Sequence, residues 1–341
     1  MSQTRRQFLK TGLAAAAAAS VPVRLGAQTP QPRISCFYQV SAEALNYYLE
    51  PGVGLPNDPG HIHIFAHSHP AANPASASLS AHIQSGGASF RYVPSFDLND
   101  HQGYMDASDA QLAEWAHTFR DIAIGANANY FAFNELPQDS GSNVRRRVQI
   151  MKLLQYLHQP DSTGRQLSGI FFMTHRPSMP ANWTSRASAF WARVDATCQL
   201  IVAEHYHGHD YICGLSESDL GAHLFAMRRW LVASGEPAKI RIANSKFTVL
   251  HSSHYGQLPS GWQGADPDDV TIAAFRRNLS KCAKVTRNTA GGFNRIAFGP
   301  LNPTDVRVHT RIRRLINWHY NQGRGAREML CLAANQANCE C

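Results

Sequence analysis

The chain lacks several features that mark common classes of protein. No segment beyond the amino terminus is apolar enough to cross a membrane. No Gly-x-Ser-x-Gly sequence, the nucleophile motif of many serine hydrolases, occurs either. Charge is sparse, with 16% charged residues and a net charge of +8 over 341 residues. Without a basic stripe or a platform of aromatic and arginine side chains, we expect no nucleic-acid partner.

Half of the net charge lies at the amino terminus. Residues 1–27 hold four basic residues and no acidic one, which leaves +4 of the +8 for the rest of the chain. Arg5 and Arg6 precede an alanine-rich apolar stretch at 13–20 and small residues at 25–27. These are the charged, apolar and cleavage regions of a signal peptide, and the apolar stretch is too short for a stable membrane anchor.

The pair Arg5-Arg6, followed by Phe8-Leu9-Lys10, resembles the bacterial twin-arginine signal. This resemblance implies a partner, the twin-arginine export machinery, which exports folded proteins. It also implies a mature chain that begins near Gln28 and acts in the periplasm or as a secreted protein.

Seven cysteines in an exported chain allow up to three disulfides. Three of them, Cys331, Cys339 and Cys341, lie together at the carboxyl end, and we expect a bridge there to hold the tail of residues 331–341. A zinc cluster at this tail would need a fourth ligand at suitable spacing, and none lies beside the three.

Short apolar segments alternate with helical patterns along the mature chain. The segments are bounded by turn residues and are too short for helices; they span residues 34–40, 61–66, 89–95, 129–133, 169–174, 200–203, 246–250 and 294–298.

Helix start signals lie between these segments. Ser108 with Gln111, and Ser216 with Asp219, have the spacing of capping residues. Further helices are predicted at residues 42–48, 77–84, 186–197 and 220–232, after Ser142, and at the capped prolines Pro267 and Pro303.

Eight strands alternating with eight helices, without a linker that divides them, predict an α/β fold with a single (β/α)₈ TIM-type barrel over residues 28–330. A doubly wound open sheet is the main alternative. It usually has a glycine-rich phosphate loop after its first strand, which this chain lacks.

Polar and aromatic side chains follow nearly every predicted strand. In a parallel barrel the carboxyl ends of the strands meet at one face, which is where such folds place their chemistry. The candidate substrate-binding residues at these ends are His67, His69, Asp97, Asn134, His175, Arg176, His205, Tyr206, His207, His251, His254 and Tyr255.

Two carboxylates at this face, Glu135 and Glu204, are the candidate catalytic residues. Glycoside hydrolysis needs two carboxyl groups beside the scissile bond, one protonated and one ionised. The segment that ends in Asn134-Glu135 resembles the strand-four Asn-Glu motif of TIM-barrel glycoside hydrolases. The resemblance implies that Glu135 is the general acid/base and that Asn134 contacts a sugar hydroxyl.

The chain departs from that family on the seventh predicted strand. The related enzymes have their nucleophile there, whereas the segment around His251 and His254 contains no carboxylate. Glu204 on the sixth strand is the substitute, so retaining and inverting mechanisms both stay open. We expect a carbohydrate substrate and neither a cofactor nor a metal.

Two alternatives remain. The pair His61 and His63, with the histidines near the strand ends, suits a metal-dependent barrel hydrolase or isomerase. The same strand ends also suit a non-catalytic barrel that only binds carbohydrate.

Overall fold

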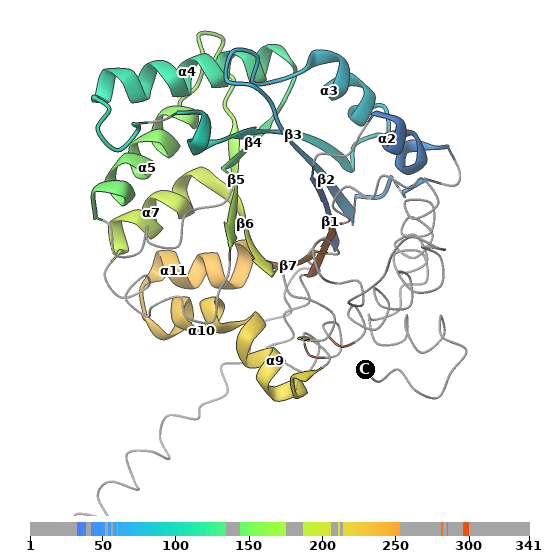
Figure 1. Ribbon diagram of the computed structural model, residues 1–341, viewed down its shortest axis with the longest axis vertical. Helices are drawn as coiled ribbons and strands as arrows, with labels where there is room; N and C mark the ends of the chain where they lie inside the picture. Colours follow the sequence, from blue (N-terminus) through green and yellow to red (C-terminus); the bar gives the residue numbers. More distant parts are fainter. Residues whose placement is uncertain are drawn as a thin grey trace, which may run out of the picture. The chain divides into compact units, whose positions relative to one another are not determined.

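A ring of parallel strands forms the centre of the computed structural model, with helices outside it (Figure 1). The structure describes residues 33–38, 42–51, 54–55, 57–59, 61–101, 103–133, 144–174, 187–205, 211, 214–252, 281, 285 and 296–299. The strands are β1 (Arg33–Tyr38), β2 (His61–Ser68), β3 (Phe90–Phe96), β4 (Tyr130–Phe133), β5 (Ser168–Thr174), β6 (Cys198–His205), β7 (Phe247–Ser252) and β8 (Ile296–Gly299). Each of the eight predicted apolar segments is therefore a strand.

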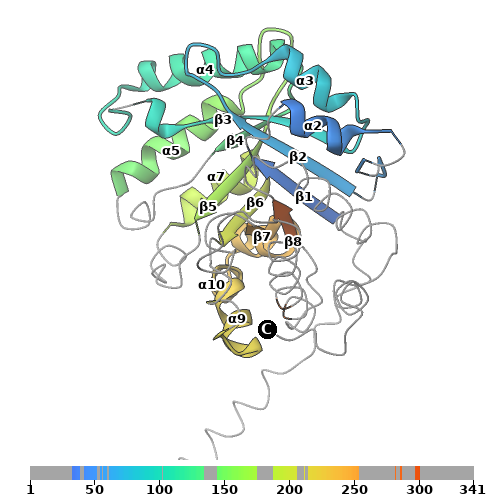
Figure 2. The ribbon, with the colours of Figure 1, turned by 45° about the vertical axis from the view of Figure 1, so that its right-hand side comes forward.

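The strands pair in sequence order, and every pairing is parallel (Figure 2). Strand β8 pairs with both β7 and β1, so the strand order is that of a closed barrel. The prediction of an α/β fold with a parallel sheet is confirmed. The helices predicted at Pro267 and Pro303, and the limits 28 and 330 of the barrel, fall outside the described residues.

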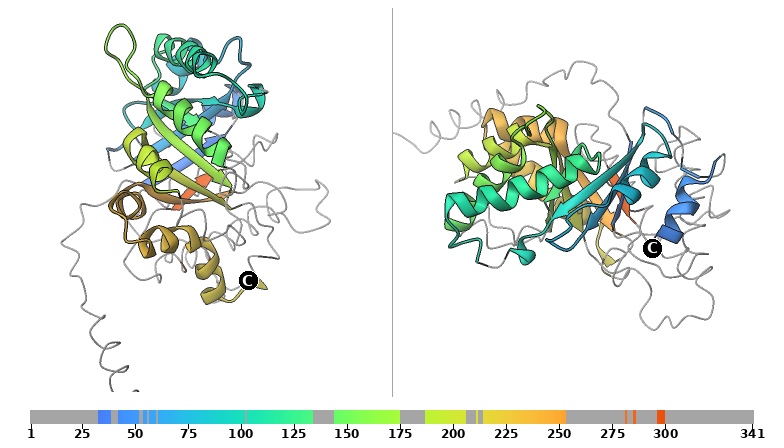
Figure 3. Two further views of the ribbon diagram at one scale, coloured as in Figure 1. Left: turned by 90° about the vertical axis from the view of Figure 1, so that its left-hand side faces the viewer. Right: turned by 90° about the horizontal axis from the view of Figure 1, so that it is seen from above.

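Helices cover the outer face of the strands. They are α2 (Ala42–Leu49), α3 (Ala77–Gln84), α4 (Asp109–Gly125), α5 (Val144–Leu157), α7 (Ser188–Thr197), α9 (Glu217–Leu224), α10 (Ala226–Ala233) and α11 (Pro237–Arg241), with a short 3-10 helix η1 (Leu98–Asp100) and a short π-helix η3 (Ile242–Lys246). Neighbouring helices α4 and α5, and then α5 and α7, pack side by side along β4 to β6 (Figure 3). In the described part of the chain, no helix is long and apolar enough to cross a membrane.

Capping side chains fix where two of these helices begin. Ser108 and Gln111 bond reciprocally at the start of α4, so the predicted capping box is confirmed. The Ser216 hydroxyl accepts the backbone N–H of Asp219 at the start of α9, at 3.0 Å. The single helix predicted at residues 220–232 is instead two helices, because the fully buried Phe225 leaves helical geometry, with φ −109° and ψ 13°.

Alternation along the strands divides the apolar side chains into two layers. The outer layer lies between the strands and the helices and contains large aromatics such as Phe65, Phe133, Phe171 and Trp191. The inner layer consists of strand side chains inside the ring: Ile34, Cys36, Ile64, Ala66, Val93, Ala132, Ile170, Phe172, Leu200 and Val202.

The predicted disulfides are not supported. The two described cysteines are free and buried, and they lie on opposite faces of the sheet, Cys36 in the inner layer and Cys198 in the outer layer. Burial raises the pKa of Cys198 to about 12 and raises that of Cys36 far above its usual range, so both thiols stay protonated. The predicted bridge in the tail of residues 331–341 falls outside the described residues.

Gly169 on β5 allows close packing between β5 and β6. An added Cβ would lie 2.7 Å from the Cys198 Sγ and 3.0 Å from the Phe131 ring. The register of β5 against β6 also shifts between Gly169 and Ile170. A side chain at this position therefore has no space unless its neighbours move.

Replacing Gly169 by alanine should lower the free energy of unfolding by about 1–3 kcal/mol, because overpacking forces the neighbours apart. Urea unfolding would measure this loss. Cys198→Ala removes the closest atom, so Gly169→Ala should destabilise the Cys198→Ala background less than it destabilises the wild type. Gly125→Ala is the control, since an added Cβ there meets nothing within 4 Å. Equal losses in the two glycine variants would contradict the packing argument.

Candidate functional site

Glu204 is the described carboxylate that faces the inside of the barrel. It follows Leu200 and Val202 on the same side of β6, and both of these belong to the inner layer. Glu204 is only 4% exposed and lies near the carboxyl end of β6, in register with Thr174 of β5 and Leu250 of β7. A carboxylate is therefore buried at the end of the barrel where this class of fold places its active sites.

Two small polar groups share the interior with Glu204. Burial, and then the negative charge of Glu204, raise the pKa of the Cys36 thiol, so the Cys36 Sγ is within electrostatic reach of that carboxylate. Ser95 lies on the inward side of β3 with Val93, is 2% exposed, and its Oγ has no hydrogen-bond partner among the residues described. Glu204 and Ser95 therefore make the interior polar near the carboxyl ends of the strands, whereas the inner layer is apolar.

His205 faces away from that interior. It is the next residue after Glu204, so its side chain points to the helix side of the sheet. Its ring centroid lies 5.3 Å from that of His223 on α9, and both residues are buried. Burial lowers the pKa of His223. His205 therefore faces the helices and not the interior that holds Glu204, and its predicted contact with a substrate stays a prediction.

His67 and His69 also lie on the helix side of the sheet, against Tyr92 of β3. The Tyr92 hydroxyl is 2.8 Å from the His69 Nε2 and accepts the backbone N–H of Ser76 at 2.9 Å. Tyr92 belongs to the outer layer, as does Phe65, which precedes His67 by two positions on β2. The two histidines thus pack beside the start of α3, which does not support a substrate contact inside the barrel.

The environment of His67 disfavours its protonated form. The residue is 5% exposed, and its Nε2 has no hydrogen-bond partner among the described residues. Burial, and then the neighbouring His69, lower the pKa of His67 to about 4. His67 is therefore neutral in the folded protein at neutral pH.

Asp97 caps a short turn. Its carboxylate accepts the backbone N–H of Asn99 at 2.8 Å, at the start of η1. The turn places His101 between the rings of Phe96 and Trp115, at centroid distances of 4.5 and 5.0 Å. The Asp97 carboxylate thus has a capping role in this turn, and its predicted contact with a substrate stays a prediction.

The other predicted site residues are placed only in part. His251 lies on β7 in register with His205 of β6. For the metal alternative, His63 packs on Phe90 on the outer face, and the described part of the chain holds no group of three or more metal-binding side chains. The remaining candidates fall outside the described residues: Asn134, Glu135, His175, Arg176, Tyr206, His207, His254 and Tyr255.

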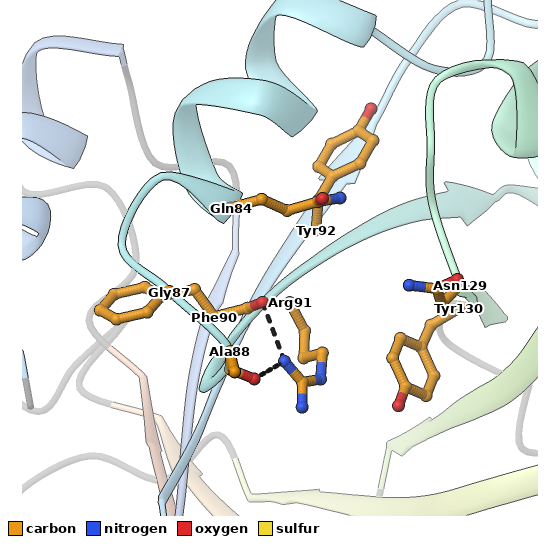
Figure 4. Close-up of a pocket in the computed structure, with 8 residues that line it drawn as sticks. All are labelled: Gln84, Gly87, Ala88, Phe90, Arg91, Tyr92, Asn129 and Tyr130. Carbon is orange, nitrogen blue, oxygen red and sulfur yellow. Dashed lines mark hydrogen bonds between the residues drawn. The ribbon is translucent and has the colours of Figure 1, made fainter. Parts of the chain in front are cut away.

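Two cavities among the described residues lie at the opposite end of the barrel. Arg91 and Tyr130, near the starts of β3 and β4, line both of them. Figure 4 shows one of the two. Neither residue is among the predicted site residues, which follow the carboxyl ends of the strands, whereas Arg91 and Tyr130 lie at their starts. The signal was present, since Arg91 is the one charged residue of β3.

Comparison with known proteins identifies the export signal. Residues 2–22 match the family of TAT (twin-arginine translocation) pathway signal sequences. The chain is therefore exported, to the periplasm or out of the cell. No curated protein matches the chain.

The solved structures that resemble the chain include two glycoside-cleaving enzymes. One is a GH18 chitinase from Pseudoalteromonas aurantia, with a TM-score of 0.50 and 9% identity over 82% of this chain and 99% of that one. The other is an endo-beta-N-acetylglucosaminidase from Cordyceps militaris, with a TM-score of 0.45 and 11% identity over 84% of this chain and 91% of that one. At such identities the first likeness shows the fold alone.

The buried His67 predicts a dependence of stability on pH. Between about pH 6.5 and pH 4 the unfolded chain protonates this histidine while the folded protein does not, so stability falls as the pH falls through that window. From pH 7 to pH 4 the loss attributable to His67 should reach about 3 kcal/mol. Chemical unfolding at both pH values should show a smaller loss for His67→Gln than for the wild type. Equal losses would contradict the assignment.

The export signal predicts that Arg5 and Arg6 are both required for translocation. Lysine retains the charge but not the planar guanidinium donors, and this kind of signal is recognised by a receptor. The double variant Arg5→Lys, Arg6→Lys should stay in the cytoplasm, as measured by cell fractionation and immunoblotting. Arg24→Lys, outside the matched residues 2–22, should be exported normally. Normal export of the double variant would contradict the assignment.

Proposed function

We propose that this exported protein is a glycoside hydrolase that cleaves an oligo- or polysaccharide outside the cytoplasm. The observation that carries the proposal is the burial of Glu204 inside the barrel, at the carboxyl end of β6. Burial of an ionised carboxylate costs free energy unless other groups stabilise its charge, so such a residue is commonly retained for a function. In parallel barrels, catalytic residues lie at this end of the strands. The likeness in fold to a chitinase is consistent with the proposal.

The proposal includes a complete TIM-type barrel. The closed strand order and the helices outside β1 to β7 support it. We infer that the segments after β7 and β8 supply the remaining helices, and that residues 28–330 form the catalytic domain, followed by the tail at 331–341.

Glu135 and Glu204 are the proposed pair of carboxylates. Glu135 follows β4 by two residues, and β5 alone separates β4 from β6. Two strand spacings of about 4.8 Å place these strand ends about 10 Å apart along the sheet, so side chains from both can reach one sugar ring. A final separation of about 5–5.5 Å between the carboxyl groups gives retention, and about 6.5–9.5 Å gives inversion.

The proposed roles follow from the chemistry. Glu135 donates a proton to the leaving oxygen, next to Asn134, whose amide binds a sugar hydroxyl. Glu204 attacks the anomeric carbon if the pair is close, or activates a water molecule if it is far. The protonated thiol of Cys36 adds no second negative charge beside Glu204. In an interior that excludes water, a carboxylate stabilises developing positive charge more strongly than it does in solution.

Replacing Glu204 or Glu135 by glutamine should lower kcat by about 10²–10⁴-fold, because the amide can neither transfer a proton nor attack. Turnover would be measured on a panel of aryl glycosides and polysaccharides, with sugar binding and thermal unfolding measured in parallel. Glu114→Gln, on the exposed side of α4, is the matched control and should leave kcat unchanged.

Three results would decide the roles of the two carboxylates and the class of enzyme. Near-normal turnover in either variant would remove that residue from the mechanism. Rescue of Glu204→Gly by azide, with a glycosyl azide of inverted configuration as the product, would identify Glu204 as the nucleophile. A requirement for added metal, with loss of activity on chelation, would replace the proposal by the metal-dependent alternative.

A further inference from the structure

The amino-terminal end of the barrel contains an apolar cavity that the proposed catalysis does not use. Its volume is about 260 Å³. Five of the nine residues that line it are aliphatic, Ile34, Ile62, Ile64, Ile170 and Leu200, and the polar residues Gln199 and Ser245 line it together with Arg91 and Tyr130. Clefts that bind drug-sized ligands occupy about 300–1,000 Å³, so an occupant of this cavity would be smaller than that. The walls favour a short hydrocarbon chain.

Arg91 brings a positive charge to this cavity. On β3 the flanking residues Phe90 and Tyr92 belong to the outer layer, so Arg91 faces inward with Val93. Its Nη1 donates to the backbone carbonyl oxygens of Ala88 and Phe90, the latter at 3.2 Å. Figure 4 shows both bonds and shows Tyr92 extending away from the guanidinium.

No carboxylate balances that charge within the described part of the chain. Arg91 makes no ion pair there, and its two acceptors are neutral carbonyl groups. A guanidinium has five N–H donors, so the donors on Nε and Nη2 remain for another group. Planar guanidinium groups match carboxylates especially well, because two parallel hydrogen bonds can form.

A second compartment shares Arg91 and Tyr130 with this cavity. It has a volume of about 280 Å³ and is lined by polar groups that include Gln84 and Asn129. The side chains of Arg91 and Tyr130 extend from β3 and β4 to the same side and line both compartments. One end of the barrel thus offers an apolar space and a polar space with a cation at their boundary.

We propose that this end of the barrel binds a small aliphatic carboxylate. The hydrocarbon chain occupies the space between Ile34, Ile62 and Leu200, and the carboxylate pairs with Arg91 at the boundary of the polar compartment. The site lies at the opposite end of the strands from Glu204, so it is separate from the proposed catalytic carboxylates.

Octanoate is the probe, titrated into the exported protein by calorimetry. Arg91→Met removes the charge and retains an unbranched apolar side chain, and it should weaken octanoate binding by about tenfold or more. Ile62→Phe, which fills part of the apolar space, should weaken it as well. Arg145→Met is the matched control, because Arg145 is an exposed arginine on α5 that pairs with Asp106 at 2.5 Å. The Arg145→Met variant should bind octanoate with the same affinity as the wild-type protein.

Two further probes keep the test independent of how the variants fold. On the wild-type protein, octanamide and octylammonium have the same chain without the negative charge, and both should bind about tenfold more weakly than octanoate. The proposal is overturned if octanoate does not bind, if Arg91→Met binds it as tightly as the wild type does, or if octylammonium binds equally well. That last result would mean that the cavity is only apolar.

Discussion

Alternation of side chains along parallel strands decides which polar groups of this protein can meet inside the barrel. Glu204 and His205 are adjacent in sequence, yet one is buried in the interior and the other is buried against α9. The same rule places His67 beneath the helices and Ser95 inside the ring. If the register of a strand slips by one residue, each of its side chains moves to the opposite face of the sheet. The site therefore depends on the parallel pairings that fix the register of each strand.

The sequence was sufficient to predict the strands and several helix starts. Apolar segments bounded by turn residues coincide with all eight strands, and the box at Ser108 and Gln111 begins α4. Such features are local, so they can be recognised without tertiary structure. The break at Phe225 could not be predicted in this way, because the helical pattern runs through it and the break accompanies burial of that ring.

The candidate site was only partly predictable for a related reason. Successive side chains of a strand point alternately into the barrel and toward the helices. Whether a residue near a strand end faces the interior therefore depends on which residues of that strand face the interior. Glu204 faces in, whereas His67 and His205 face the helices. His69 lies past the end of β2, where Tyr92 on the neighbouring strand fixes it. Such contacts join strands that are distant in the sequence, so the sequence of one strand alone does not reveal them.

The buried cysteines have a consequence for how the protein tolerates its compartment. The compartments to which the export signal directs the chain are oxidising, and exposed thiols there form disulfides. Cys36 and Cys198 are separated by the thickness of the sheet, and burial keeps both thiols protonated. A chain that folds before it crosses the membrane meets oxidants only after these two sulfurs are enclosed. Folding before export would therefore protect Cys36 and Cys198 from mispairing, whereas export of an unfolded chain would expose both thiols to oxidants.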